Sequence, residues 1–556
     1  MAGLLLAAAL SATACAPSEP GPPVSSLQDD RERPDGSGRV DGVERVDGGG
    51  RVDHGGRPAL IVLIVVDQLP QYLFARYEAL FSGGFRRLLR DGRVYTHGSH
   101  EHSSTTTAPG HTTIATGVYP LNHGIVANWW REWTGDRWAY VENFEDSTES
   151  VLGRPGLPGF SPRKLDATGL ADWLVAADRD ARIVSISGKY RGAVPLAGRV
   201  AAHVYVFDEK YGPGFTTSTF YRPELPGWLR RFNEERLAAL LADSVWESTV
   251  PESARGASRP DTVAYEHGGA HVAFPHRFVE EANPGDVADA AAFYAWWEDT
   301  PMLDEAAVEL AMDAVAALQL GQREATDLLA LALSATDRVG HAFGPFSREQ
   351  LDNLLRLDRV LGDLFAFLDR TVGTGDYLVA LSSDHGVLPA PEYRQELGEE
   401  GGRVTPAQLV EIVKAIDTVN AASETERNAR RAAVLEEFDL VADAMTREEL
   451  LASGPADTLL TLYRRCYRRD RPTGLGDRGV NVRLREGYMT GGNTATHGSP
   501  YAYDRRVPIV FMAAGVTAGR SDERVATVDI APTIARLAGV PFPDNLDGRV
   551  LICDGC

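Results

Sequence analysis

The chain has 556 residues, of which 44% are hydrophobic and 8% aromatic, so it is long enough and apolar enough to bury a sizeable globular core. It carries 78 Asp and Glu against 56 Lys and Arg, which gives a formal net charge of −22. This acidic excess argues against nucleic acid as a specific partner, because binding a phosphate backbone needs a cationic surface. An anionic small molecule would have to be held by a local positive site.

Residues 1–15 have the features of an export signal. A short apolar run, Leu4 to Leu10, is followed by small residues and then by Cys15. The run is too short to span a bilayer as a helix. Cys15 after Ala12-Thr13-Ala14 resembles a bacterial lipoprotein cleavage site, although no Lys or Arg precedes the run. We therefore expect an exported protein, periplasmic or held at the outer membrane as a lipoprotein, and leave the acylation of Cys15 open.

Residues 16–57 are rich in Pro, Gly, Asp and Arg and contain few apolar side chains. The unit Arg-Val-Asp recurs in this segment at 39–41, 45–47 and 51–53. A segment of this composition cannot bury enough surface to fold, so we predict a disordered linker. A single catalytic domain is expected to follow at 58–552.

Strands and helices alternate along this domain. Continuously apolar runs predict strands buried on both faces of a sheet, and apolar residues at helical spacing predict the helices. The expected strands are 60–66, 181–187, 328–335, 377–383 and 507–513. The expected helices are 71–89, 305–320, 348–369, 530–538 and one that begins at Thr112. This alternation predicts an α/β fold with a mainly parallel central sheet flanked by helices.

Three long segments interrupt the alternation, at about 133–164, 195–301 and 387–484. The first is rich in Trp and Gly, the second carries several aromatic residues, and the third is helical and charged. Because the core pattern resumes after each segment, we interpret them as insertions that form a cap and not as separate domains.

Acidic and histidine side chains follow several of the predicted strands, and one more histidine precedes the last core strand. In chain order they are Asp67, Asp337, His341, Asp384, His385 and His497. In an open α/β sheet ligands bind at the carboxyl ends of the strands, so these side chains are expected to meet at one edge of the sheet. Mixed Asp/His sets suit zinc, and with one added hydroxyl they are enough for two ions.

The segment from Thr105 to Asn128 combines a cluster of hydroxyls, a proline turn and Gly110. A Thr hydroxyl is a poor nucleophile at its ordinary pKa and needs an activator. No Ser/His/Asp arrangement surrounds the segment, so metal ions are the expected activator. Two ions roughly 3.5–4 Å apart can bind both the attacking and the leaving oxygen of an in-line phosphoryl transfer.

These motifs resemble those of the alkaline phosphatase superfamily, in its nucleotide pyrophosphatase/phosphodiesterase-like branch. The segment Thr107-Ala108-Pro109-Gly110-His111 is similar to the T-x-P-x-H loop of that branch, which implies Thr107 as the nucleophile. Asn128 matches its phosphoryl-binding asparagine. The resemblance implies that one zinc is held by Asp337, His341 and His497. It implies that the other is held by Asp67, Thr107, Asp384 and His385.

Lys189-Tyr190-Arg191 resembles the K-x-R pair of the phosphate-irrepressible type of bacterial alkaline phosphatase, which the diesterases lack. A phosphate monoester carries about −1.5 to −2 charges at neutral pH, against one on a diester. Lys189 and Arg191 would therefore supply donors to its extra oxygens, together with the Asn128 amide. The resemblance implies a two-zinc phosphomonoesterase that acts on small-molecule phosphate esters through a covalent phosphothreonine and releases inorganic phosphate.

Two alternatives stay open. A phosphodiesterase or nucleotide pyrophosphatase would use the same two ions, and a non-catalytic binding protein would have kept the fold without the chemistry. Sulfatase activity is not expected, because the loop lacks the Cys or Ser that matures to formylglycine. We expect a monomer or a weak oligomer. Neither the natural alcohol nor the pairing of Cys466, Cys553 and Cys556 follows from the sequence.

The other histidines near the threonine segment are not expected to bind metal. His97, His100 and His102 are interpreted as exposed turn residues. His111 and His123 are expected to make structural hydrogen bonds around the loop.

Overall fold

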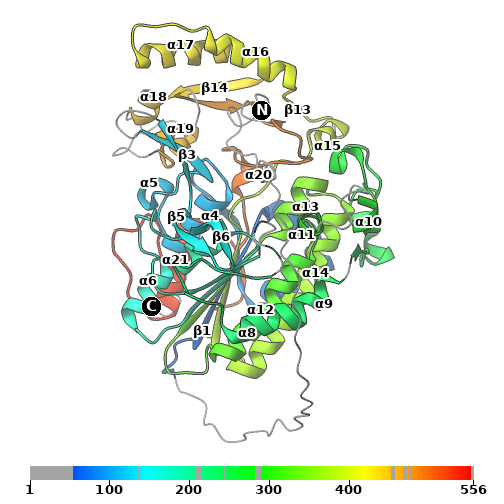
Figure 1. Cartoon of the computed structure of the whole chain (residues 1–556), viewed down its shortest axis with the longest axis vertical. Helices are drawn as coiled ribbons and strands as arrows, with labels where there is room; N and C mark the ends of the chain where they lie inside the picture. The colour runs from blue at the N-terminus through cyan, green and yellow to red at the C-terminus, as the bar shows by residue number, and fades with distance from the viewer. Residues whose placement is uncertain are drawn as a thin grey trace, which may run out of the picture.

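The computed structural model describes residues 54–552, except 134–137, 208–209, 211, 213, 243, 282–289, 453–457, 468–472 and 475–478. The expectations for the export signal, for Cys553 and Cys556 and for nearly all of the linker lie outside the described residues. Figure 1 shows a central sheet with helices on both faces, and a further group of helices and short strands above one end of it. Within the described part, no helix combines the length and the apolar composition needed to cross a membrane.

Eight strands form the central sheet, in the order β19-β2-β18-β12-β1-β11-β7-β8. They are β1 (Leu60–Val66), β2 (Arg93–Ser99), β7 (Ile183–Ser187), β8 (His203–Val206), β11 (Asp327–Leu333), β12 (Tyr377–Ser382), β18 (Ile509–Met512) and β19 (Gly519–Ala526). β1 pairs in parallel with β11 and β12, and the parallel arrangement continues through β7 to β8. Only β18 runs against its neighbours in this sheet. The predicted mainly parallel sheet is confirmed.

The central strands are apolar because both faces of the sheet are covered. Every residue of β1 and of β11 is buried. Alternate residues of β1 pack into two different hydrophobic clusters, one on each face, with Val62, Ile64 and Val66 in one and Ile61, Leu63 and Val65 in the other. Burial on both faces, worth roughly 25 cal/mol per Å² of apolar surface, fixes the position of β1 in the centre of the sheet.

Helices cover the two faces as shown on the right and left of Figure 1. One face carries α2 (Gln71–Tyr77), α3 (Gly84–Asp91), α12 (Met302–Leu318), α13 (Ala335–Phe343) and α14 (Arg348–Leu368). The other carries α4 (Thr107–Thr116), α6 (Leu170–Ala177), α7 (Tyr190–Ala197) and α21 (Ile530–Leu537). The predicted helices 305–320, 348–369 and 530–538 correspond to α12, α14 and α21.

The prediction of one helix over 71–89 is wrong, because the chain breaks between α2 and α3. Asp358 of α14 explains the break. Its carboxylate accepts hydrogen bonds from the backbone N–H groups of Ser82 and Gly83, both at 2.7 Å, and of Phe85 at 2.8 Å, and so caps the start of α3. A Cβ on Gly83 would lie 2.2 Å from the carbonyl oxygen of Asp358, so this close approach requires glycine.

The segments that interrupt the core pattern have structure of their own. Antiparallel pairs form between β3 (Trp129–Trp133) and β4 (Trp138–Glu142), and between β5 (Glu145–Val151) and β6 (Arg154–Phe160). Above the sheet in Figure 1 lie α16 (Pro406–Asp417), α17 (Glu424–Glu436), β14 (Val441–Thr446), α19 (Thr458–Arg464), β16 (Val480–Leu484) and β17 (Tyr488–Met489). These upper elements include a separate hydrophobic cluster, to which α16, α17, β14 and β16 contribute.

Candidate active site

Three neighbouring strands deliver carboxylates and imidazoles to one edge of the sheet. Asp67 follows β1 directly, Asp337 lies in the first turn of α13 after β11, and Asp384 and His385 follow β12. The three strands are parallel and adjacent, so their carboxyl ends lie at the same edge. His497 reaches this edge from the loop before β18. The structure therefore brings together the six Asp and His side chains that the sequence predicted as ligands.

Asp67, Asp384 and His385 form the first group of candidate metal ligands. One ligand atom from each lies within 4.8 Å of the other two, and all three residues are buried. His385 Nε2 is 3.3 Å from Asp67 Oδ1 and 3.4 Å from Asp384 Oδ2. None of these three atoms has a hydrogen-bond partner among the described residues. Because buried polar atoms are costly to leave unsatisfied, three of them facing one another fit a cation.

Asp337, His385 and His497 form the second group, so His385 belongs to both. Asp337 Oδ1 is 3.5 Å from His497 Nε2 and 3.2 Å from His341 Nε2. Asp337 and His341 lie four residues apart on one helix, α13. One helical turn therefore places both side chains on the same face.

The three histidines are held in the same orientation by backbone carbonyls. The Nδ1 atoms of His341, His385 and His497 donate hydrogen bonds at 2.9, 2.9 and 2.8 Å to the carbonyl oxygens of Ala495, Gly386 and Thr105. A proton on Nδ1 leaves Nε2 as the electron-pair donor. This is the second hydrogen bond by which metal-binding histidines are usually oriented.

Lys189 lies between the two groups. Its buried ammonium is 2.6 Å from Asp67 Oδ2 and also pairs with Asp337 Oδ2. Burial and the charge of Asp337 alone would raise the pKa of Asp67, but Lys189 and His385 outweigh them and lower it. The pKa of Asp337 is held well below its usual range by His341, Lys189 and His497, against the effect of burial. Both carboxylates are therefore ionised, as ligands of a cation must be.

Thr107 is the first residue of α4, so the prediction that this helix begins at Thr112 is wrong. Pro109 stands in the first turn, where its missing N–H is not needed, and therefore does not delay the start of the helix. The Thr107 hydroxyl is consequently placed at the N-terminus of a ten-residue helix. The positive end of the helix dipole makes such a position suitable for an anion.

Gly110 and His111 fasten α4 to the metal-ligand edge. A Cβ on Gly110 would lie 2.1 Å from the carbonyl oxygen of Asp384, so the helix can approach this loop only with glycine there. His111 Nδ1 is 2.9 Å from the carbonyl oxygen of Thr107 and 3.1 Å from Asp384 Oδ2. The expected structural hydrogen bonding of His111 is confirmed by its bond to Thr107, and the same ring nitrogen lies at ion-pair distance from a candidate ligand.

The structure places the other predicted substrate contacts as follows. Asn128 Oδ1 accepts a hydrogen bond of 2.9 Å from the backbone N–H of Ala108, next to Thr107. Lys189 is the residue before α7, and Arg191 is half-buried in the first turn of that helix. Asn128 thus contacts α4, which carries Thr107, and Lys189 contacts two of the candidate ligands. Arg191 lies near the site because it follows Lys189 by two residues.

Gln68 is a residue of this site that the sequence did not indicate. Its side-chain amide donates to Asp337 Oδ1 at 2.5 Å, and its backbone N–H donates to Asp384 Oδ1 at 3.1 Å. It adopts φ = 64°, a conformation that costs a non-glycine residue of order 1 kcal/mol. A Cβ on Gly340 would lie 2.0 Å from Gln68 Oε1, so the glycine between Asp337 and His341 makes room for it. In the sequence, the only sign that Gln68 belongs to the site is that it directly follows Asp67.

The interpretation of His100 and His102 as exposed is wrong, because both are fully buried. His102 Nε2 is 3.3 Å from His100 Nδ1 and 3.3 Å from Thr113 Oγ1 of α4. His100 Nε2 donates at 2.9 Å to the carbonyl oxygen of Ser383, the residue before Asp384. Burial lowers the pKa of His100 to about 3, so the ring is neutral. These two histidines contact segments next to the candidate ligands and to Thr107. Neither belongs to a candidate metal group among the described residues.

Comparison with known proteins gives consistent matches over most of the chain. Residues 61–470 match the model of the type I phosphodiesterase / nucleotide pyrophosphatase family. Alkaline phosphatase PhoV of Synechococcus elongatus is 30% identical, over 89% of this chain and 92% of that protein. Alkaline phosphatase PafA of Elizabethkingia meningoseptica is 30% identical, over 89% of this chain and 94% of that protein. The crystal structure of wild-type PafA matches with a TM-score of 0.79 at 28% identity, over 89% of this chain and 98% of that one.

Proposed function

Because the chain belongs to the type I phosphodiesterase / nucleotide pyrophosphatase family, we propose that it is a hydrolase of the alkaline phosphatase type that acts on phosphate monoesters. Relatives that carry this name are 30% identical over most of the chain. The observation that carries the proposal is the convergence of two groups of buried ligand atoms beside the N-terminus of α4, where Thr107 lies.

In this proposal two zinc ions occupy the sheet edge. One is held by Asp337, His341 and His497, and the other by Asp67, Thr107, Asp384 and His385. The unsatisfied atoms of Asp67, Asp384 and His385 and the common orientation of the three imidazoles support such a pair, and Asp/His sets suit zinc. When bound, the ions supply positive charge that lowers the pKa of a hydroxyl and stabilises charge on the transferred phosphoryl group.

Thr107 is the proposed nucleophile. Its Oγ1 forms a bond to phosphorus as the bond from phosphorus to the ester oxygen breaks, so the alcohol leaves and a phosphothreonine remains. Water then attacks the same phosphorus, the bond to Thr107 Oγ1 breaks, and inorganic phosphate is released. The positive end of the α4 dipole lies at Thr107 and favours the negative charge of the phosphoryl group. Since Asn128 Oδ1 accepts from Ala108, the Asn128 amide nitrogen is the group that would donate to the substrate.

Lys189 and Arg191 are the proposed basis of monoester specificity. The Lys189 ammonium lies between the two ligand groups. A phosphoryl group that contacts both ions would therefore lie next to this ammonium. A monoester presents more charge to it than a diester does. A solved PafA variant carries substitutions at a threonine, an asparagine, a lysine and an arginine. Its threonine and asparagine have the same separation as Thr107 and Asn128, and its lysine and arginine the same as Lys189 and Arg191, which supports these four positions.

The second candidate is a phosphodiesterase, which the description of the matching family favours. The two are separated by comparing kcat/KM on phenyl phosphate and on methyl phenyl phosphate. We expect Thr107→Ala to abolish both activities. Lys189→Ala is expected to lower the monoester rate by about tenfold to a hundredfold, since a charge-assisted hydrogen bond contributes about 1.5–3 kcal/mol, and to lower the diester rate less.

Lys414→Ala is the matched control, because Lys414 is an exposed lysine on α16, away from the sheet edge. It should leave both rates unchanged. Equal losses on the two substrates in Lys189→Ala would contradict monoester specificity. A purified protein that retains no bound zinc and hydrolyses neither ester would contradict the enzyme assignment itself.

A further inference from the structure

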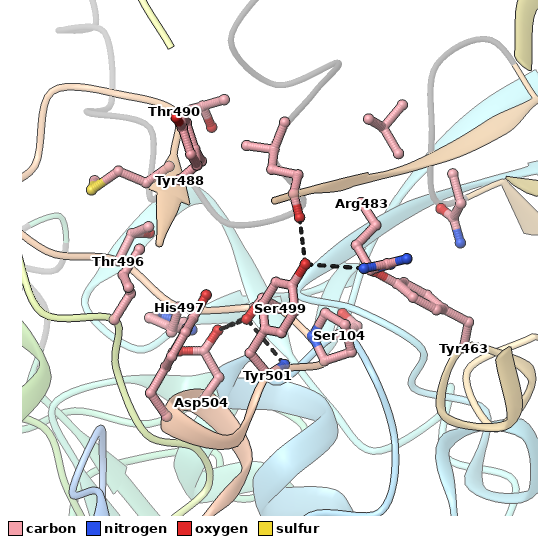
Figure 2. Close-up of a pocket in the computed structure, with 18 residues that line it drawn as sticks. Ser104, Tyr463, Arg483, Tyr488, Thr490, Thr496, His497, Ser499, Tyr501 and Asp504 are labelled. Carbon is pink, nitrogen blue, oxygen red and sulfur yellow. Dashed lines mark hydrogen bonds between the residues drawn. The ribbon is translucent and has the colours of Figure 1, made fainter. Parts of the chain in front are cut away.

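A pocket adjoins the candidate active site on the side of His497 (Figure 2). Its floor comes from the loop 496–504 and from Ser104, three residues before Thr107. Its other wall comes from the upper elements, with Tyr463 of α19, residues 481–484 of β16 and residues 488–490. The cavity has a volume of about 100 Å³.

Two buried hydrogen-bond donors in this pocket have no acceptor. Asn481 is 7% exposed, and its side-chain nitrogen has no hydrogen-bond partner among the described residues. The same holds for Nε of Arg483, two residues further along β16. A buried donor without an acceptor costs about 1–3 kcal/mol. The pair therefore points to a ligand that brings acceptor oxygens.

Aromatic rings stand beside these donors. Tyr463, Tyr488 and Tyr501 line the pocket, and Figure 2 shows the Tyr501 hydroxyl bonded to Arg483. That hydroxyl donates to the carbonyl oxygen of Leu484 at 2.7 Å and accepts from Arg483 Nη1 at 3.1 Å, so the ring is fixed. Fixed aromatic faces favour stacking with a flat ring.

The charge of the pocket favours a neutral ligand group. Arg483 Nη2 is 3.5 Å from Asp443 Oδ2, so a carboxylate already offsets the guanidinium. Asp504, also in the lining, accepts hydrogen bonds from the N–H and the hydroxyl of Ser499, and burial raises its pKa to about 7. A carbonyl oxygen of the ligand would accept hydrogen bonds from Asn481 and Arg483 and would add no charge to the pocket.

The position of the pocket relates it to the alcohol of the substrate. His497 contributes both to the pocket lining and to the ligand group around Asp337, and Ser104 leads into Thr107. Resting on the proposed function, we infer that this pocket binds the alcohol portion of the phosphate monoester and favours alcohols with a flat ring that carries carbonyl oxygens, as in a pyrimidine nucleoside. Asn481 and Arg483 are then the residues that determine specificity.

The test compares two substrates that share the same leaving oxygen. Uridine 5′-monophosphate has the ring, and ribose 5-phosphate lacks it. We expect kcat/KM of the zinc-loaded protein to be about tenfold higher for the first, given the worth of one base stacked on an aromatic ring. Asn481→Ala and Arg483→Met should each remove most of this preference. Equal rates on the two esters in the parent protein would overturn the inference.

Matched controls come from the same upper elements. Asn420→Ala and Arg485→Met change exposed residues outside the lining and should preserve the preference. If Asn481→Ala unfolds, as judged by circular dichroism, Asn481→Ser takes its place. Variants that slow both substrates equally would contradict a role in specificity.

A separate measurement distinguishes failure of this inference from failure of the proposed function. Binding of uridine, the product alcohol, is measured by calorimetry and does not depend on catalysis. If the protein hydrolyses neither ester, the proposed function fails, but uridine binding that Asn481→Ala weakens about fivefold to tenfold would still support the pocket. Hydrolysis without a preference and without uridine binding would overturn the pocket alone.

Discussion

Buried histidines meet buried carboxylates in two regions of this molecule, and the two differ in how their atoms are satisfied. His276 of β10 (His276–Arg277) uses both ring nitrogens, with Nδ1 at 2.8 Å from Glu281 Oε1 and Nε2 at 3.1 Å from Glu349 Oε1. At the sheet edge, His385 Nε2 and the facing oxygens of Asp67 and Asp384 have no hydrogen-bond partner among the described residues. The same residue types thus form an internal support in one region and a candidate binding site in the other.

The comparison shows that composition alone does not identify a metal site. A histidine between two carboxylates is complete when each of its nitrogens has a partner, and a cation would then have to displace a hydrogen bond. Where the ligand atoms converge without bonding one another, binding a cation satisfies them at no such cost. Saturation of the hydrogen bonds is therefore the criterion, and each region can be tested separately by replacing its histidine.

The largest effect is expected from removing the histidine shared by both ligand groups. His385→Ala should lower kcat/KM on phenyl phosphate at least about a thousandfold, because loss of a residue that merely orients a ligand already costs about 10–100-fold. Bound zinc, measured by elemental analysis, should fall below two ions per chain. His97→Ala, an exposed histidine, is the control and should keep both values. If His385→Ala were fully active, the sheet edge would not be the catalytic metal site, and the proposed difference between the two regions would be wrong.

The next effect concerns stability. His276→Ala leaves Glu281 and Glu349 buried without their cationic partner, which should lower the free energy of unfolding by about 3 kcal/mol. Urea denaturation measures this loss, again with His97→Ala as control. The folded fraction should keep its activity on phenyl phosphate, because His276 lies in neither ligand group. A loss of activity that exceeds the loss of folded protein would show that this region also serves the chemistry.

The smallest effect is a pH dependence of the same contribution. Burial alone would lower the pKa of His276, but Glu281 and Glu349 outweigh it and raise the pKa to about 9. A histidine whose pKa is raised on folding stabilises fully below its unfolded value of ~6.5. That stabilisation is lost as the pH rises through about 9. The stability difference between the parent protein and His276→Ala should therefore shrink between pH 6.5 and 9. A difference that stays constant would contradict a charged His276.

The central strands and the candidate metal ligands could be recognised in the sequence for one reason. Strands buried on both faces must be continuously apolar, so β1, β11 and β12 were visible as runs, and polar residues at their ends were conspicuous. Asp67 and Asp384 needed no knowledge of tertiary contacts. β2 and β19, in contrast, are rich in polar residues and have mixed burial, so neither period nor composition marked them as strands.

The features that escaped prediction depend on contacts between distant segments. The start of α3 is set by Asp358, which caps it from another helix. His100 and His102 have a polar local sequence and are buried by contacts with distant segments, among them α4 and the Ser383 loop. Asn481 and Arg483 lie in a segment without regular apolar spacing, and their partnerless nitrogens are visible only in the folded chain.

Gln68 has a consequence for how the candidate site would take up ions. Its side chain is bonded to Asp337, beyond β11, and its backbone to Asp384, beyond β12. A single residue thereby acts as a rigid spacer between carboxylates that belong to different ligand groups. The separation of the two groups is then a property of the polypeptide, and incoming cations enter a frame that is already assembled, with little entropy left to lose.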